Sequence, residues 1–205
     1  TKYFREEFSF EEIKKWFDDL MEEYGKWATF QCEMKNQRQA SIKELDFPYE
    51  YRPGQKKLVS DVYRTIMRQK LLFMQAPTGV GKTISTIFPA VKAVGEELAD
   101  RIFYLTAKTI TATVAKETFA LLEKNGYRAK TIQITAKEKL CPCDEMECNP
   151  VTCPYAKGHF DRVNDAVFDL LHRCEMIERD DILSQADRYT VCPFELCLDT
   201  ASWCD

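Results

Sequence analysis

Residues 76–83 carry the side chains and backbone groups that bind phosphate in many proteins. In chain order they are Ala76, Pro77, Thr78, Gly79, Val80, Gly81, Lys82 and Thr83. Successive backbone N–H groups of a loop with this spacing turn inward at a helix N-terminus and bind an anion, and the glycines permit its close approach. The lysine ammonium then reaches the β- and γ-phosphates, and the threonine hydroxyl binds Mg²⁺. The spacing therefore predicts a nucleoside-triphosphate site with Lys82 and Thr83 as its catalytic residues.

Apolar runs and helical patterns alternate around this loop and predict an α/β fold. The predicted elements are a strand at 71–74, a helix at 84–94, a strand at 101–105, a helix at 110–124 and a strand at 130–134. This order is typical of a mostly parallel sheet covered on both faces. Ligands of such sheets bind at the carboxyl ends of the strands, where the phosphate loop and residues 106–109 fall.

The chain before this region is predicted to be helical up to about residue 45. Ser9 and Glu12 have the spacing of a capping box at a helix start, and apolar residues then recur at helical intervals. A turn rich in proline and glycine at 47–55 leads into a further helix predicted at 57–69.

Cysteine is the second class of residue with potential chemistry. The chain has nine cysteines, of which Cys141, Cys143, Cys148, Cys153, Cys174, Cys192 and Cys197 lie within one region, with Cys204 just beyond. A disulfide framework is one interpretation, but a phosphate loop indicates the reducing cytosol, where disulfides rarely persist. Ligation of a metal or a cluster is therefore favoured.

The spacing of these cysteines favours an iron–sulfur cluster over zinc. Zinc ribbons usually carry C-x-x-C pairs, which are absent here. Proline follows Cys141, Cys153 and Cys192, as it does after ligands in ferredoxin-type sites. Cys174 instead falls within a helical apolar stripe from 163 to 177, which predicts a buried core thiol.

Composition limits the classes of partner and the setting. The formal net charge of −4 gives no electrostatic signature of nucleic-acid binding. No apolar run is long enough to span a bilayer, so we expect no membrane partner and a cytoplasmic protein. The chain opens at Thr1 without a methionine, so an excised piece of a longer protein is expected.

Several blocks resemble, in order, the iron–sulfur superfamily 2 DNA helicases of the DinG/XPD type. Residues 47–55 resemble the family's adenine-recognising Q-motif, 76–83 its motif I, and 104–109 its motif Ia. Lys139-Leu140-Cys141, Cys153-Pro154-Tyr155 and Cys192-Pro193-Phe194 resemble parts of its cluster domain. The resemblance runs from about residue 47 to the end of the chain.

The resemblance implies ATP-driven 5′-to-3′ movement on single-stranded or forked DNA, in repair or replication. In the family's pattern Gln55 and Arg52 would recognise adenine, and Lys82 and Thr83 would hold phosphate and Mg²⁺. Thr106, Lys108 and Thr109 would contact the DNA backbone. A [4Fe–4S] cluster would be held by Cys141, Cys148, Cys153 and Cys192, with Cys143 as the rival for one of the first three positions.

The resemblance also implies an organisation for the chain. Residues 1–45 would form a helical linker to an upstream nuclease-like domain, and 46–139 a RecA-like motor domain. Residues 140–192 would form an inserted, Cys-rich and mainly helical cluster domain, and 193–205 would return to the motor domain. No Asp-Glu-Ala-His box and no second motor domain follow, so we expect the chain alone to be inactive.

A further group of residues mixes basic and aromatic types, as a surface that stacks single-stranded bases would. It comprises Tyr155, Lys157, His159, Phe160 and Arg162. A solvated loop of mixed composition is an equally good interpretation of this group.

Two other functions remain open at this stage. The first is a P-loop ATPase with a structural zinc module that is not a helicase. The second is a binding module in which the Cys-rich domain is an adaptor and the phosphate loop is vestigial.

Overall fold

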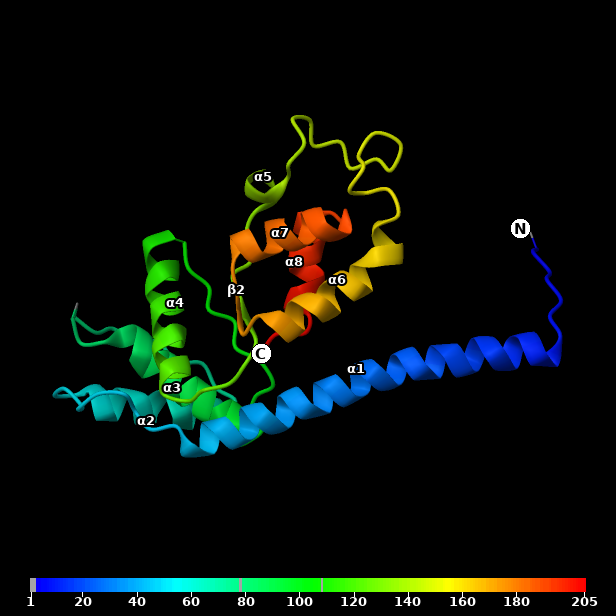
Figure 1. Ribbon diagram of the computed structural model, residues 1–205. Coiled ribbons are helices and arrows are strands. Elements are labelled where there is room, and N and C mark those ends of the chain that lie inside the picture. The colour runs from blue at the N-terminus through cyan, green and yellow to red at the C-terminus, as the bar shows by residue number, and fades with distance from the viewer. Residues whose placement is uncertain (1–2, 78, 108) are drawn as a thin grey trace. The chain divides into compact units, whose positions relative to one another are not determined.

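The computed structural model describes residues 3–77, 79–107 and 109–205. Its helices are α1 (Phe10–Glu44), α2 (Gln55–Met67), α3 (Lys82–Gly95), α4 (Thr109–Lys124), α5 (Lys137–Leu140), α6 (His159–Arg173), α7 (Arg179–Tyr189) and α8 (Pro193–Ala201) (Figure 1). The strands are β1 (Thr131–Ile132) and β2 (Met176–Ile177). The chain divides into two compact units, one ending at Asn36 and the other spanning Gln37–Asp205.

The first unit contains the beginning of α1, and its predicted capping box is confirmed. The Ser9 N–H donates to the Glu12 carboxylate at 2.8 Å, and the Glu12 N–H donates to the Ser9 hydroxyl at 3.3 Å. These hydrogen bonds lower the pKa of Glu12. The apolar side chains that follow at helical spacing are exposed, with Trp16 at 61% and Tyr24 at 65%. The sequence therefore determines where this helix starts through local contacts alone.

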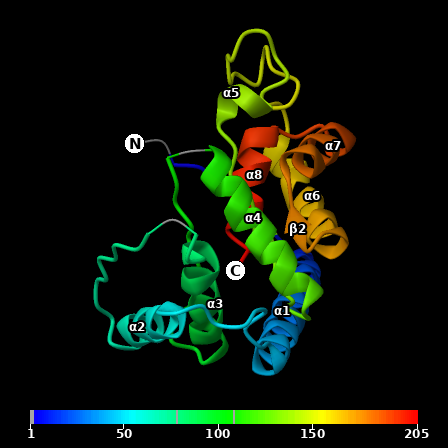
Figure 2. The same ribbon diagram turned by 90° about the vertical axis from the view of Figure 1, so that its left-hand side faces the viewer.

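The core of the second unit joins the last turns of α1 to α3 and α4. Its buried members are Ile42, Leu45, Ile84, Ile87, Phe88, Val91, Val94, Ala115, Leu122 and Tyr127. Figure 2 shows α2 lying beside α3, with which it is in contact. The helices predicted at 57–69, 84–94 and 110–124 are all present within one or two residues of their predicted bounds.

The predicted α/β fold with a RecA-like, mostly parallel sheet is wrong. The described residues are mainly helical, and their sheet consists of β1 and β2 alone, paired in parallel with Thr131 opposite Met176. The segments 71–74 and 101–105, predicted as strands, belong to no sheet in the described chain.

The physical reason is that an apolar run does not specify its backbone partner. Along 101–105 the side chains do alternate, since Ile102 and Tyr104 pack against the core while Phe103 and Leu105 are 71% and 88% exposed. A strand also needs a neighbour for its N–H and C=O groups, and that neighbour is set by distant sequence. The side chains of this run thus alternate as they do in a strand, but the predicted sheet is wrong.

The last three helices pack against one another beyond the small sheet. The described contacts join α6 to α7 and α8, and α8 to β1. The apolar stripe predicted from 163 to 177 is helical only to Arg173. The chain leaves the helix at Cys174, and Ile177 lies in β2, where it pairs with Ile132 of β1. Among the helices described, none has both the length and the apolar character needed to cross a membrane.

Candidate functional site

The turn before α2 lies against the phosphate loop, although the two are well separated in the sequence. Gln55 is 4% exposed, and its Oε1 accepts the Arg52 N–H at 3.0 Å. Its Nε2 would lie only 2.6 Å from a Cβ atom placed on Gly81. The Arg52 guanidinium donates to the Gly79 carbonyl. The structure therefore brings the predicted adenine-recognising residues into contact with the predicted phosphate-binding residues.

Gly81 ends the phosphate loop and precedes the first residue of α3. It has a φ of 77°, a left-handed conformation that suits glycine, and no side chain caps the helix that follows. Gly81 therefore supplies no side chain to the first N–H groups of α3, which an anion could bind instead.

The remaining residues of the loop are arranged around this helix start. Ala76, Pro77, Gly79 and Val80 have no helical or strand structure, and Thr78 lies outside the described residues. Lys82 is exposed, and its ammonium donates to the Ala76 carbonyl at 2.9 Å. The ammonium is thus held against an oxygen acceptor of its own loop.

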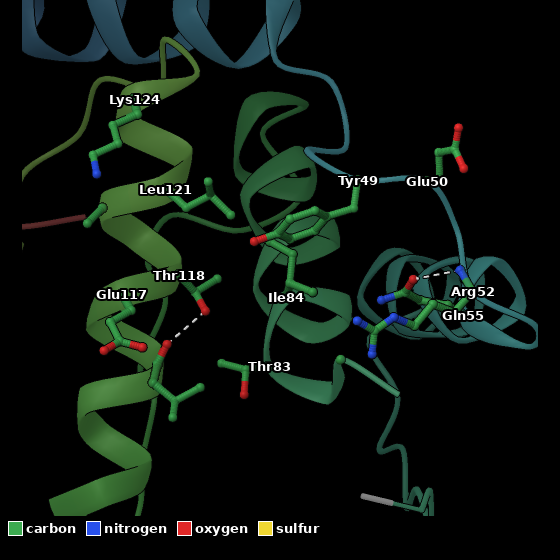
Figure 3. Close-up of a pocket in the computed structure, with 13 residues that line it drawn as sticks. Tyr49, Glu50, Arg52, Gln55, Thr83, Ile84, Glu117, Thr118, Leu121 and Lys124 are labelled. Atoms are coloured by element: carbon green, nitrogen blue, oxygen red, sulfur yellow. Dashed lines mark hydrogen bonds between the residues drawn. The ribbon is translucent and has the colours of Figure 1, made fainter. Parts of the chain in front are cut away.

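A pocket of about 740 Å³ opens beside Gly81 and Thr83 (Figure 3). One wall is formed by Tyr49, Glu50, Arg52, Gln55, Gly81, Thr83 and Ile84. The other is formed by Val114, Glu117, Thr118, Ala120, Leu121 and Lys124 of α4. The volume is within the usual range of small-molecule sites. Lys82 is not part of the lining, since its side chain turns back to Ala76.

The wall formed by α4 was missed by the sequence analysis. Its residues 114, 117, 118, 121 and 124 recur at helical intervals, so one face of the predicted helix could have been identified. The direction in which that face points depends on how α4 packs against α3 and could not be predicted locally.

The structure divides the predicted thiol ligands into two groups. Cys143 and Cys153 lie with their sulfur atoms 4.0 Å apart, and the Cys141 thiol lies 4.0 Å from the Cys143 carbonyl oxygen. Burial, followed by the hydrogen bond with Cys153, raises the pKa of Cys143 to about 11. Cys143, the rival ligand, therefore lies beside the predicted ligand Cys153.

The second group comprises Cys148 and Cys192, which both interact with Lys137. The pKa of Lys137 is raised, first by a hydrogen bond with Cys148 and to a lesser degree by the charge of Cys192. Cys192 is the N-cap of α8, and its backbone N–H donates to Nδ1 of His159 at 3.2 Å. Burial raises the pKa of the Cys192 thiol, against the N–H groups of α8 that lower it.

The donor chemistry of these thiols fits a soft metal or an iron–sulfur cluster. Across the described ranges, no three His, Cys, Asp or Glu side chains converge closely enough to hold a metal ion. Both figures of the whole chain show the loop that carries Cys141 to Cys153 extending away from α6, α7 and α8. The iron–sulfur cluster therefore stays a prediction from the cysteine spacing and the motif resemblance.

The residues predicted to contact the DNA backbone lie, in chain order, just before α4 and at its start. Thr106 is exposed and lines a separate hollow beside β1, Lys108 lies outside the described residues, and Thr109 begins α4.

The basic and aromatic group at 155–162 lies in the turn before α6 and in its first residues. Tyr155 is half-buried and Lys157 exposed. His159 is 4% exposed, so it offers no surface for stacking. Arg162 donates to the carbonyls of Lys157, Tyr189 and Thr190 at 2.6 to 2.9 Å. The Arg162 side chain thus holds the end of α7 to the turn before α6.

Comparisons of this chain with protein-family models, with curated proteins and with solved structures gave no match. The resemblance to iron–sulfur helicases therefore stays a prediction from the motifs.

Proposed function

We propose that the chain binds ATP with Mg²⁺ in the pocket beside the phosphate loop, as the nucleotide-binding part of an ATP-dependent 5′-to-3′ DNA helicase. The observation that carries the proposal is the contact of Gln55 with Gly81 and of Arg52 with Gly79. Adenine recognition and phosphate binding need these two segments to be adjacent, and neither segment specifies the other locally.

In this proposal each residue has a separate role. Arg52 and Gln55 recognise the base, the N-terminus of α3 and Lys82 bind the β- and γ-phosphates, and Thr83 supplies an oxygen to Mg²⁺. The hydroxyl of Thr83 suits a hard cation that prefers oxygen ligands. DNA as the partner, a cytoplasmic setting and a [4Fe–4S] cluster are proposed from the motif resemblance alone.

A calorimetric titration of the chain with ATP in the presence of Mg²⁺ tests the nucleotide site. We expect Lys82→Ala to weaken binding roughly 10- to 100-fold, because it removes a charge-assisted contact with phosphate. Lys56→Ala is the matched control, since Lys56 is an exposed lysine of α2 outside the pocket lining and should bind ATP as the unchanged chain does. Equal affinity of the unchanged chain and Lys82→Ala would contradict the proposal.

Metal content distinguishes the helicase from a P-loop ATPase with a zinc module. Protein purified without oxygen should contain iron and sulfide in equal amounts, about four of each per chain, if the thiols hold a cluster. About one zinc and no sulfide would instead indicate the zinc module. This measurement is independent of ATP binding.

A further inference from the structure

Glu117 places a carboxylate in the same pocket as the hydroxyl of Thr83. The two residues belong to α4 and α3, and both line the pocket that lies between these helices (Figure 3). In the described part of the chain neither side chain forms a hydrogen bond or an ion pair, and Glu117 is exposed.

The other polar groups of the pocket are engaged or distant. The Thr118 hydroxyl donates to the Val114 carbonyl at 2.8 Å, and Gln55 is held by Arg52. Glu50, the other carboxylate of the lining, lies beyond Tyr49 at the far end of the pocket from Thr83 (Figure 3). Glu117 is therefore the carboxylate on the side of the pocket where Thr83 lies.

A carboxylate at this place has opposite effects on free and magnesium-bound triphosphate. Without a cation it repels the phosphates, because both groups are negative. When Mg²⁺ lies between the carboxylate and the phosphates, the carboxylate instead strengthens binding of the triphosphate. The reason is that Mg²⁺ takes oxygen ligands from one or two carboxylates and from phosphate. The sign of its effect on ATP affinity thus depends on the cation.

We infer that Glu117 completes the divalent-cation site of this pocket opposite Thr83. The inference rests on the proposed binding of ATP with Mg²⁺. In this role Glu117 supplies an acidic group to a chain whose sequence contains no Asp-Glu-Ala-His box.

The test measures ATP affinity of the full chain by calorimetry, in excess Mg²⁺ and in excess chelator. Glu117→Gln should bind ATP roughly tenfold more weakly with Mg²⁺ and severalfold more tightly without it. The gain in affinity that Mg²⁺ produces is then largely lost. Two controls remove one carboxylate each, Glu50→Gln at the other end of the pocket and Glu123→Gln on α4 outside the lining. Both should retain the gain from Mg²⁺.

Each outcome decides a separate question. If Glu117→Gln keeps the full gain from Mg²⁺, the inference is overturned while the proposed ATP site stands. If Glu123→Gln loses the gain equally, the effect is one of net charge and the inference is also overturned. If the unchanged chain binds no ATP in either condition, the proposed function itself fails. A thermal melt of each variant verifies that it is folded.

Discussion

At the scale of single residues, one glycine connects the backbone of the phosphate loop to the side chain that faces it. Gly81 has a positive φ, and the Nε2 atom of Gln55 fills the space that a side chain at 81 would need. Two separate physical reasons thus require glycine here: the backbone conformation and the close approach of Gln55. They can be separated by substitution.

Gly81→Ala should destabilise the chain by about 2 to 3 kcal/mol, as the left-handed backbone costs about 1 to 2 kcal/mol and Gln55 must also move. It should weaken ATP binding at least tenfold, since Gln55 and the start of α3 both shift. Urea unfolding and ATP titration measure the two effects.

Gly126→Ala is the control for backbone strain alone. Gly126 has a φ of 100°, nothing lies within 4 Å of the place that an added Cβ would take, and the residue follows α4 away from the pocket lining. We expect a loss of about 1 kcal/mol and unchanged ATP affinity. Equal losses of ATP affinity in both variants would contradict the role of the contact between Gly81 and Gln55.

At the scale of elements, a buried glutamine joins α6 to α7. Gln185 is fully buried, and its Nε2 donates to the Ala166 carbonyl at 2.7 Å and to the Asp169 carboxylate at 2.9 Å. The same carboxylate accepts a hydrogen bond from Arg188 at 2.8 Å. The bond from Gln185 is the main cause that lowers the pKa of Asp169, and Arg188 and Arg173 add to it. Polar contacts therefore fix how these two helices meet.

Asp169→Asn should destabilise the chain by about 1 to 2 kcal/mol at neutral pH, because charged hydrogen bonds are replaced by weaker neutral ones. The lowered pKa determines how this difference depends on pH. The stabilisation from the charged carboxylate is complete above 3.8, the ordinary pKa of aspartate, and is lost as the pH falls through the lower value of the folded state.

Urea unfolding of the unchanged chain and of Asp169→Asn, repeated from pH 7 to pH 3, measures this dependence. The gap in stability between them should be largest at pH 7 and should narrow below pH 3.8. A gap that stays constant over this range would show that Asp169 acts through its shape and not through its charge.

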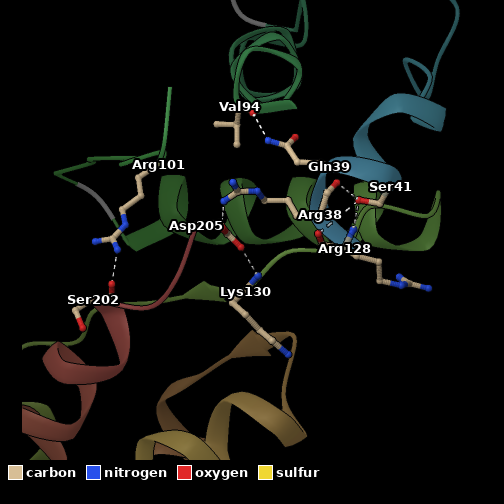
Figure 4. Close-up of polar contacts among 9 residues, drawn as sticks. All are labelled: Arg38, Gln39, Ser41, Val94, Arg101, Arg128, Lys130, Ser202 and Asp205. Carbon is tan, nitrogen blue, oxygen red and sulfur yellow. Dashed lines mark hydrogen bonds and ion pairs between the residues drawn. The ribbon is translucent and has the colours of Figure 1, made fainter. Parts of the chain in front are cut away.

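At the scale of the whole second unit, an ion pair connects residues far apart in the chain. The Arg38 guanidinium pairs with the Asp205 carboxylate, and both side chains are mostly buried (Figure 4). The same carboxylate accepts the Lys130 N–H at 2.9 Å, while the Asp205 N–H donates to the Lys130 carbonyl at 2.9 Å. Three distant segments are thereby held at one place.

Arg38→Met should destabilise the chain by about 3 kcal/mol, because it leaves a buried carboxylate without its partner. Asp205→Asn, combined with it, should recover part of that loss, so that the two effects are not additive. Lys57→Met is the control for an exposed pair, since Lys57 is 81% exposed beside Asp61, and it should cost less than about 1 kcal/mol. Urea unfolding of the single and double variants measures the coupling, and additive losses would contradict it.

The elements that could be predicted are those with local causes. The capping box of Ser9 and Glu12 and the helix at 110–124 depend on spacings of a few residues, and both are present. The sheet could not be predicted, because the runs at 71–74 and 101–105 carry no information about their partners. For the same reason the spacing of the cysteines did not reveal that the Cys143 and Cys153 sulfur atoms lie 4.0 Å apart.

The sequence by itself determined the helices, the phosphate-binding pattern and the identity of the residues that could bind ATP, since these follow from short-range geometry and side-chain chemistry. Only the tertiary structure decided that Gln55 lies against Gly81, and that α4 brings Glu117 into the pocket that Thr83 also lines. Such contacts depend on the packing of elements that lie far apart in the chain, and packing is specified by the whole core and not by any one segment.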